Sequence, residues 1–183
     1  MFKHMKIGVR LGLAFGIVLL LMLVTIFVGM TRMEKIDQRL QTIVDDNIVK
    51  LNLLGEMRTD LRDTAIAARD CLLMTDPAAK QDEAQRVKNY RASYNETAQK
   101  LAALVTSADG KALLGKIDAA GQTNTPLVDQ AIQLCLAGKG QQAIAVLTVQ
   151  AKPSERAMMS SLEDLKKLQD TDNDHDAARA RQE

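Results

Sequence analysis

A long apolar run near the N-terminus contrasts with the mixed pattern of the rest of the chain. Residues 11–30 contain no charged side chain, and Thr25 is the only polar one among them. A helix of this length spans about 30 Å, the thickness of the hydrocarbon core of a bilayer. A buried helix of a soluble protein keeps a polar face, and a cleaved signal peptide has a shorter apolar core and a small-residue cleavage site. We therefore predict a retained transmembrane helix.

Basic residues define the orientation of this helix. Lys3, Lys6 and Arg10 precede the apolar run, and basic flanks stay on the cytoplasmic side of a membrane. We expect residues 1–10 to form a cytoplasmic leader. Residues 31–183 then form a single extracytoplasmic domain, since their number suits one compact domain.

Beyond the apolar run, apolar residues recur every three or four positions, as in packed helices. Turn signals divide this region: Asp76 and Pro77 suit a cap and a first helical residue, and Ser107–Gly110 and Gly138–Gly140 are turn-like. Short turns make neighbouring helices antiparallel. The fold class is therefore all-α, an up-down-up-down four-helix bundle with long first and fourth helices. The four helices are expected over about 31–74, 78–105, 111–137 and 140–183.

Composition agrees with a helical protein and gives no sign of catalysis. Aromatic residues are 3% of the chain, and the net charge of +1 gives no argument for nucleic acid. His4 and His175 have no metal-binding spacing, and no nucleophile–base arrangement is present. Asp170–Asp174 imitates the start of an EF-hand loop, but Gly and Glu are missing at its sixth and twelfth positions. We expect no enzyme, no cofactor and no metal site.

Three stretches resemble bacterial methyl-accepting chemotaxis proteins that carry a four-helix-bundle sensor domain. They are KIGVRLGLAFG (6–16), MRTDLRDTAIAARDCLLMTDPAAK (57–80) and GKALLGKIDAA (110–120). The resemblance implies a homodimeric periplasmic sensor in the bacterial inner (cytoplasmic) membrane. It also implies signalling to a chemotaxis kinase and its adaptor through a cytoplasmic region. The same sensor module occurs on histidine kinases and cyclases.

The expected topology returns the fourth helix to the membrane. A second transmembrane helix and a cytoplasmic part should then follow residue 183, so we expect the sequence to be the N-terminal part of a longer receptor.

Two cysteines lie at similar heights in the expected bundle. Cys71 and Cys135 are each close to a membrane-distal turn, in a periplasm that oxidises thiols. The first and third helices are diagonal, however, and at usual helix spacings their α-carbons would be about 9 Å apart. Disulfides require 4.4–6.8 Å. We therefore predict two buried free thiols in preference to a bridge.

A basic stripe on the first bundle helix is the clearest candidate binding feature. Arg58, Arg62 and Arg69 are 4 and 7 residues apart, within about 40° of one another on a helix. Guanidinium groups bind carboxylates bidentately, so the stripe predicts a site for a small organic anion. The alternative is that these arginines pair with Asp60, Asp63 or Glu56 on a solvent-exposed surface.

Other polar residues are expected at the depth of Arg62, about 21 Å below the distal turns. Asn124 is the only polar residue in the heptad of the third helix, and Pro153 interrupts the fourth. Both leave polar groups that need partners, which fits a ligand pocket or a hydrated packing irregularity. Besides the three arginines, the ligand-binding candidates are Tyr90, Arg91, Tyr94, Asn124 and Thr125.

These patterns predict a receptor for a small carboxylate or amino acid. The alternative is a sensor or dimerisation bundle of a histidine kinase or cyclase with no ligand of its own. We also predict a parallel homodimer through the first bundle helix, since its apolar residues near the membrane lack cover from the other helices. These residues are Ile36, Leu40, Ile43 and Val44.

Overall fold

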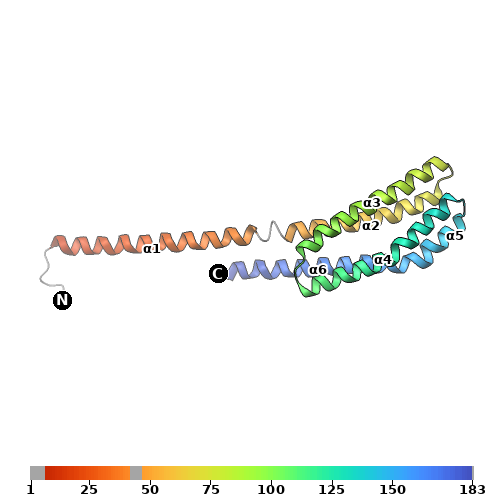
Figure 1. The fold of residues 1–183 in the computed structure, drawn as a ribbon. Coiled ribbons are helices and arrows are strands. Elements are labelled where there is room, and N and C mark those ends of the chain that lie inside the picture. The colour runs from red at the N-terminus through yellow and green to blue at the C-terminus, as the bar shows by residue number, and fades with distance from the viewer. Residues whose placement is uncertain (1–6, 42–46, 183) are drawn as a thin grey trace.

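The computed structural model describes residues 7–41 and 47–182, and side chains mainly over 11–30 and 47–172. Within these ranges every regular element is a helix (Figure 1). The elements are α1 (Ile7–Gln41), α2 (Val49–Leu73), α3 (Pro77–Leu104), α4 (Ala108–Leu136), α5 (Gly140–Ala145), the π-helix η2 (Val146–Ala151) and α6 (Lys152–Gln182).

Helix α1 lies apart from the other helices in Figure 1. Among the described residues it is the one helix long and apolar enough to cross a membrane, over Leu11–Met30, and none of that stretch is buried. The single polar side chain of this stretch is satisfied within the helix, because the Thr25 hydroxyl donates to the Leu21 carbonyl at 2.7 Å. By length and composition, α1 matches the predicted transmembrane helix.

The remaining elements form the predicted up-down-up-down bundle. Helices α2 and α3 pack along each other as one antiparallel hairpin, and α4 packs along η2 and α6 as a second. Helix α6 continues past the α3–α4 turn towards the side on which α1 lies (Figure 1). The predicted continuous first bundle helix, 31–74, crosses residues 42–46, which lie outside the described residues.

Short polar side chains determine where two of the helices begin. Asp76 accepts a hydrogen bond from the Ala79 backbone N–H at 3.2 Å, and Pro77 occupies the first helical position, as predicted. Ser107 accepts from the Gly110 N–H at 3.2 Å. Helix α4 therefore starts nearly one turn before its predicted position, because Ser107 caps it instead of sitting in a longer turn. Gly110 packs closely here: a Cβ would lie 2.5 Å from Val105 Cγ1.

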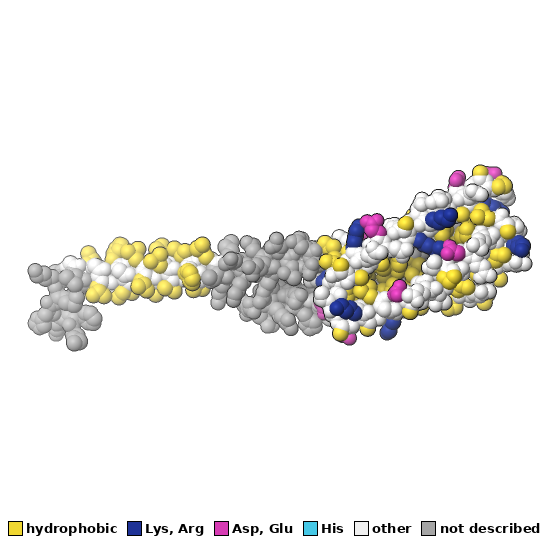
Figure 2. Space-filling model, viewed as in Figure 1, with side chains coloured by type: hydrophobic (Ala, Val, Ile, Leu, Met, Phe, Trp, Pro, Cys, Tyr) yellow, Lys and Arg dark blue, Asp and Glu magenta, His cyan; other side chains and the backbone are white. Residues whose placement is uncertain are grey.

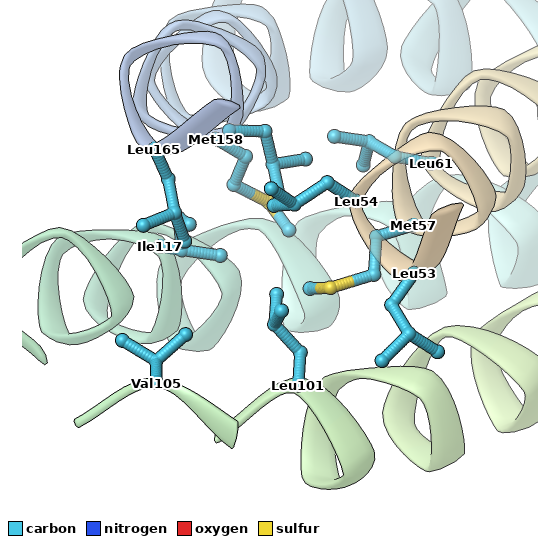
Figure 3. Packing of buried hydrophobic residues seen from close by; sticks show 10 residues of the cluster. Leu53, Leu54, Met57, Leu61, Leu101, Val105, Ile117, Met158 and Leu165 are labelled. Atoms are coloured by element: carbon cyan, nitrogen blue, oxygen red, sulfur yellow. The ribbon is translucent and has the colours of Figure 1, made fainter. Parts of the chain in front are cut away.

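The main hydrophobic core occupies the half of the bundle nearer α1. Large apolar side chains from all four bundle helices meet there (Figure 3), as the three-four spacing predicts. The fully buried members are Leu54, Met57, Leu101, Leu162 and Leu165.

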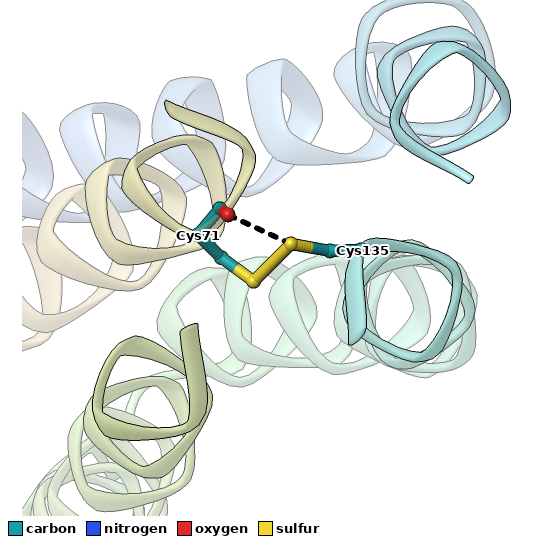
Figure 4. Close-up of a disulfide and its surroundings, with 2 residues drawn as sticks. All are labelled: Cys71 and Cys135. Atoms are coloured by element: carbon teal, nitrogen blue, oxygen red, sulfur yellow. Dashed lines mark hydrogen bonds between the residues drawn. A yellow bond between two sulfur atoms is a disulfide. The ribbon is translucent and has the colours of Figure 1, made fainter. Parts of the chain in front are cut away.

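The distal core is built from smaller side chains and contains a disulfide. Cys71 on α2 and Cys135 on α4 are bonded, with their α-carbons 6.5 Å apart (Figure 4). The prediction of two free thiols is therefore wrong. It assumed ordinary helix spacings, whereas Ala67, Ala68 and Ala84 surround the bridge. Small side chains let helix axes approach, which brings the diagonal helices within disulfide reach.

The fourth bundle helix changes pitch about two turns from its start. The π-helix η2, with wide i→i+5 turns, ends directly before α6, and Pro153 lies near the start of α6. Proline supplies no backbone N–H and removes one helical hydrogen bond. The predicted interruption at Pro153 is therefore a change of helical register and not a break in the helix.

Candidate functional site

Two cavities open where the two hairpins meet. Contacts between the hairpins are fewer than those within each hairpin, so space remains on both sides of the bundle. The α3–α4 groove has a volume of about 840 Å³ and the α2–α6 pocket about 350 Å³. Both fall in the usual range for small-molecule sites. Leu61, Thr64 and Asn124 line both cavities and form a shared wall.

The α2–α6 pocket is rich in positive charge. Arg69 from α2 and Lys152 and Arg156 from α6 line it, against a single carboxylate, Glu155. Glu155 Oε1 lies 3.3 Å from Lys152 Nζ and 3.6 Å from Arg69 Nη2. One carboxylate shared between two cations leaves a surplus of positive charge in the cavity. The pocket can therefore attract an anion.

Asn124 fixes the wall between the cavities. Its Nδ2 donates to the Ala151 carbonyl at 3.1 Å and to Ser154 Oγ at 3.2 Å. Ser154 Oγ in turn donates to the same carbonyl at 2.8 Å. These bonds join α4 to the boundary between η2 and α6. The one polar heptad residue of α4 thus has the partners that its burial requires.

The α3–α4 groove has an apolar floor and a polar rim. Met57, Leu61, Ile117 and Met158 contribute apolar surface, and Figure 2 shows hydrophobic side chains in the hollow between α3 and α4. The rim includes carboxamide and ionisable side chains from the two facing helices. Its members are Arg91, Tyr94, Asn95 and Gln99 on α3, and Asp118, Gln122 and Thr125 on α4.

Arg91 and Tyr94 differ in how they are satisfied. Arg91 forms an ion pair with Asp129 and donates to the Thr125 carbonyl at 3.2 Å. Tyr94 Oη is buried and, among the described residues, has no hydrogen-bond partner. Burial raises the pKa of Tyr94, and the nearby Asp118 carboxylate raises it further. The hydroxyl therefore stays protonated at neutral pH.

The three arginines of the basic stripe face α6 or solvent. Arg58 pairs with Glu163 at 2.7 Å, Arg62 with Asp63 at 3.0 Å, and Arg69 with Glu155 as described above. Their side chains are 47%, 61% and 50% exposed. Ion pairs between side chains as solvent-exposed as these contribute about 0–1 kcal/mol each to stability. Of the predicted partners, only Asp63 is used, by Arg62, whereas Arg58 and Arg69 pair with carboxylates of α6.

The eight candidate residues do not converge on one cavity. Arg69 lines the α2–α6 pocket, and Asn124 lines both cavities. Arg58, Arg62 and Tyr90 line neither, and Tyr90 instead accepts from Arg86 Nη2 at 3.2 Å. The stripe on α2 faces α6, while the α3 residues face α4, so the expected single slab is divided between two sides of the bundle. The candidates in the α3–α4 groove alone are Arg91, Tyr94 and Thr125.

Sequence reasoning missed the cations of α6. Lys152 and Arg156 lie on either side of Pro153, the residue of the fourth helix already expected at the depth of Arg62. Including one helical turn on each side of that depth would have found them. No group of three or more potential metal-ligating side chains that could hold a metal ion occurs in the described part of the chain.

Comparison with known proteins agrees with this architecture. A family model described as a four helix bundle sensory module for signal transduction matches residues 4–182. No curated protein matches the chain.

Proposed function

The chain belongs to the family of four-helix-bundle sensory modules for signal transduction, and from this premise we propose that it senses ligands for a transmembrane chemoreceptor. The apolar stretch of α1 has no protein cover, which supports insertion into the bacterial cytoplasmic membrane. The basic leader supports a periplasmic bundle. The Cys71–Cys135 disulfide also favours an oxidising compartment.

The proposed ligand is a small organic anion, a carboxylate or an amino acid, bound in the α2–α6 pocket. The observation that carries this proposal is the set of three cations around one carboxylate in a cavity of about 350 Å³. The 3.6 Å contact between Arg69 and Glu155 is longer than a good hydrogen bond. Arg69 is therefore available to a ligand carboxylate, and its planar guanidinium suits bidentate binding.

An anion in this pocket would bridge two helices that transmit the signal. Arg69 belongs to α2, whereas Lys152 and Arg156 belong to α6. The ligand favours whichever arrangement of α6 against α2 binds it more tightly. Shifts of about 1–2 Å between packed helices are an established form of switching. The register change at Pro153 adjoins the pocket and is the proposed point of adjustment.

The binding proposal is tested by thermal melting of residues 1–183 in lipid nanodiscs with dicarboxylates and amino acids. An anion at 100 times its dissociation constant should stabilise the bundle by about 2.7 kcal/mol. Arg69→Ala should weaken binding by about 10- to 100-fold, because it removes a charge-assisted hydrogen bond.

Arg62→Ala is the matched control, since Arg62 lies on the same helix and is exposed but lines neither cavity. It should bind as the parent does. If no acid stabilises the parent, or if Arg69→Ala responds as fully as the parent, the anion site is disproved. If no acid changes the melting temperature of the parent, the alternative of a dimerisation bundle of a kinase or cyclase is favoured.

The signalling proposal is tested with Pro153→Ala in the full-length receptor. This substitution restores a backbone N–H where the helix changes register. Anion binding should stay nearly unchanged, because the Pro153 side chain does not line the pocket. The cellular response to the anion should weaken, and an undiminished response would contradict the role of Pro153.

A further inference from the structure

We propose that the α3–α4 groove is a second ligand site, for an uncharged and largely apolar molecule that carries a hydrogen-bond acceptor. This site lies on the other side of the shared wall from the α2–α6 pocket. Three features of the groove carry the proposal: its apolar floor, its balanced charges and a buried hydroxyl that has no hydrogen-bond partner among the described residues.

The groove offers apolar surface at the scale of a small molecule. Met57 and Met158 reach its floor from α2 and α6, beside Ile117 of α4. Methionine side chains adapt to ligands of different shape. Burial of apolar ligand surface contributes about 25 cal/mol per Å². A cavity of about 840 Å³ therefore has room for a molecule whose affinity comes mainly from this floor.

The charges around the groove favour neither an anion nor a cation. Arg91 and Asp118 are the two charged side chains among its lining residues. Arg91 is already held by Asp129 and by the Thr125 carbonyl. Asp118 accepts a hydrogen bond from Gln122 at 2.9 Å. The two lining charges are opposite and leave the groove without a net charge, so a charged ligand would lose hydration without a surplus of opposite charge to meet it. The α2–α6 pocket, in contrast, has such a surplus.

Tyr94 supplies the polar contact that an acceptor would meet. Its Oη is buried without a partner among the described residues, and an unsatisfied buried hydroxyl costs about 1–3 kcal/mol. Helices α3 and α4 make few contacts with each other, so a ligand can part them enough to reach Oη. A carbonyl or ether oxygen that accepts from Tyr94 recovers that cost.

Benzophenone is a suitable probe because it is uncharged, carries one carbonyl and labels nearby C–H bonds on irradiation. The full chain in lipid nanodiscs is irradiated with it, and labelled peptides are mapped by mass spectrometry. We expect labelling at Met57 and Met158. Labelling along Leu11–Met30 serves as an internal reference, because that stretch is unburied and apolar.

Gly115→Leu tests the groove without disturbing the fold. Gly115 lines the groove, and a Cβ there would meet no atom within 4 Å. Leucine also favours helix more than glycine does, so the melting temperature should not fall. Labelling at Met57 and Met158 should drop by about tenfold as the side chain fills the cavity, while labelling along α1 stays constant.

Gly55→Leu is the matched control. Gly55 is an exposed helical glycine on α2 with the same open space around it, and it does not line the groove. Its labelling pattern should equal that of the parent. Labelling confined to α1, or groove labelling that Gly115→Leu leaves intact, would overturn the proposal.

Competition with diphenylmethane, which lacks the carbonyl of benzophenone, distinguishes the hydrogen bond of Tyr94 from apolar binding to the floor of the groove. In the parent, benzophenone should bind about two- to tenfold more tightly, the worth of one neutral hydrogen bond. Tyr94→Phe should abolish this preference and leave diphenylmethane binding unchanged. Equal preference in the parent and in Tyr94→Phe would refute the assigned hydroxyl contact.

Discussion

At the scale of single residues, Asn124 and Tyr94 differ in whether their buried polar groups form hydrogen bonds. Both place a polar group inside a bundle of apolar side chains. The Asn124 amide donates to the Ala151 carbonyl and to Ser154 Oγ, so it joins α4 to η2 and α6. Tyr94 leaves its hydroxyl unpaired among the described residues. A satisfied buried group serves the fold, whereas an unsatisfied one is a candidate for binding.

The buried hydroxyl of Tyr94 predicts a stability loss in alkali. An unfolded tyrosine ionises near pH 10, and burial, reinforced by Asp118, raises the pKa of Tyr94 in the folded chain. Above pH 10 the unfolded state therefore loses a proton that the folded state keeps, so unfolding becomes more favourable as pH rises. Below pH 10 the contribution is constant.

Urea unfolding between pH 8 and pH 11 measures this effect, with Tyr94→Phe as the comparison. Phenylalanine carries no titrating proton, so the variant should gain stability relative to the parent above about pH 10. Lysines that also titrate there are common to both proteins and cancel. Parallel stability curves across the range would show that Tyr94 ionises normally.

At the scale of elements, the disulfide divides the bundle into a clamped end and a free end. The bridge joins α2 to α4, and therefore the two hairpins, near the distal turns. Both cavities lie where the hairpins have fewer contacts. Because the distal end is tied, opening of either cavity should move the ends of α2 and α6 that lie towards α1 more than the distal turns.

Reduction of Cys71–Cys135 should lower the free energy of unfolding by about 4 kcal/mol. The bridge closes a loop with a sequence separation of 64, and the stabilisation grows with loop length. Denaturant melts with and without a phosphine reductant measure the change. The double variant Cys71→Ala/Cys135→Ala is the control and should be insensitive to reductant. A parent that melts identically in both conditions would argue against the bridge.

At the scale of the whole molecule, the bundle leaves apolar surface towards α1. Ile48 and Val49 at the start of the bundle are 46% and 40% exposed. Ile36 and Leu40 belong to α1, and the predicted dimer residues Ile43 and Val44 lie outside the described residues. In the sequence, positions 36, 40 and 43 follow the three-four spacing of a coiled-coil seam, and Ile48 and Val49 extend the apolar surface towards them.

We therefore predict that residues 31–183 associate as a parallel homodimer through this region. Sedimentation equilibrium should give a concentration-dependent dimer, weaker than in the membrane because the anchor no longer raises the effective concentration. Ile48→Glu should shift the equilibrium towards monomer, since a charge in the seam loses hydration. Leu73→Glu, at an exposed position near the distal turn, should not. A strict monomer at high concentration would contradict the prediction.

The amino-acid sequence determined the elements of this protein, because their signals are local. An uncharged run long enough for a bilayer, the helix cap at Asp76, and three-four spacing each depend on neighbours within a few residues. Such spacing establishes which face of a helix is apolar. The bundle class follows, since four such helices with short turns have few other ways to bury those faces.

Tertiary structure alone decided which helix each polar residue faces and how closely the helices approach. The arginine stripe faces α6 and Tyr94 faces α4, a distinction that helical periodicity does not contain. The cysteines pair because alanines beside them bring diagonal helices together. Helix spacing is the outcome of side-chain packing over the whole core, so it is decided only when every helix is in place.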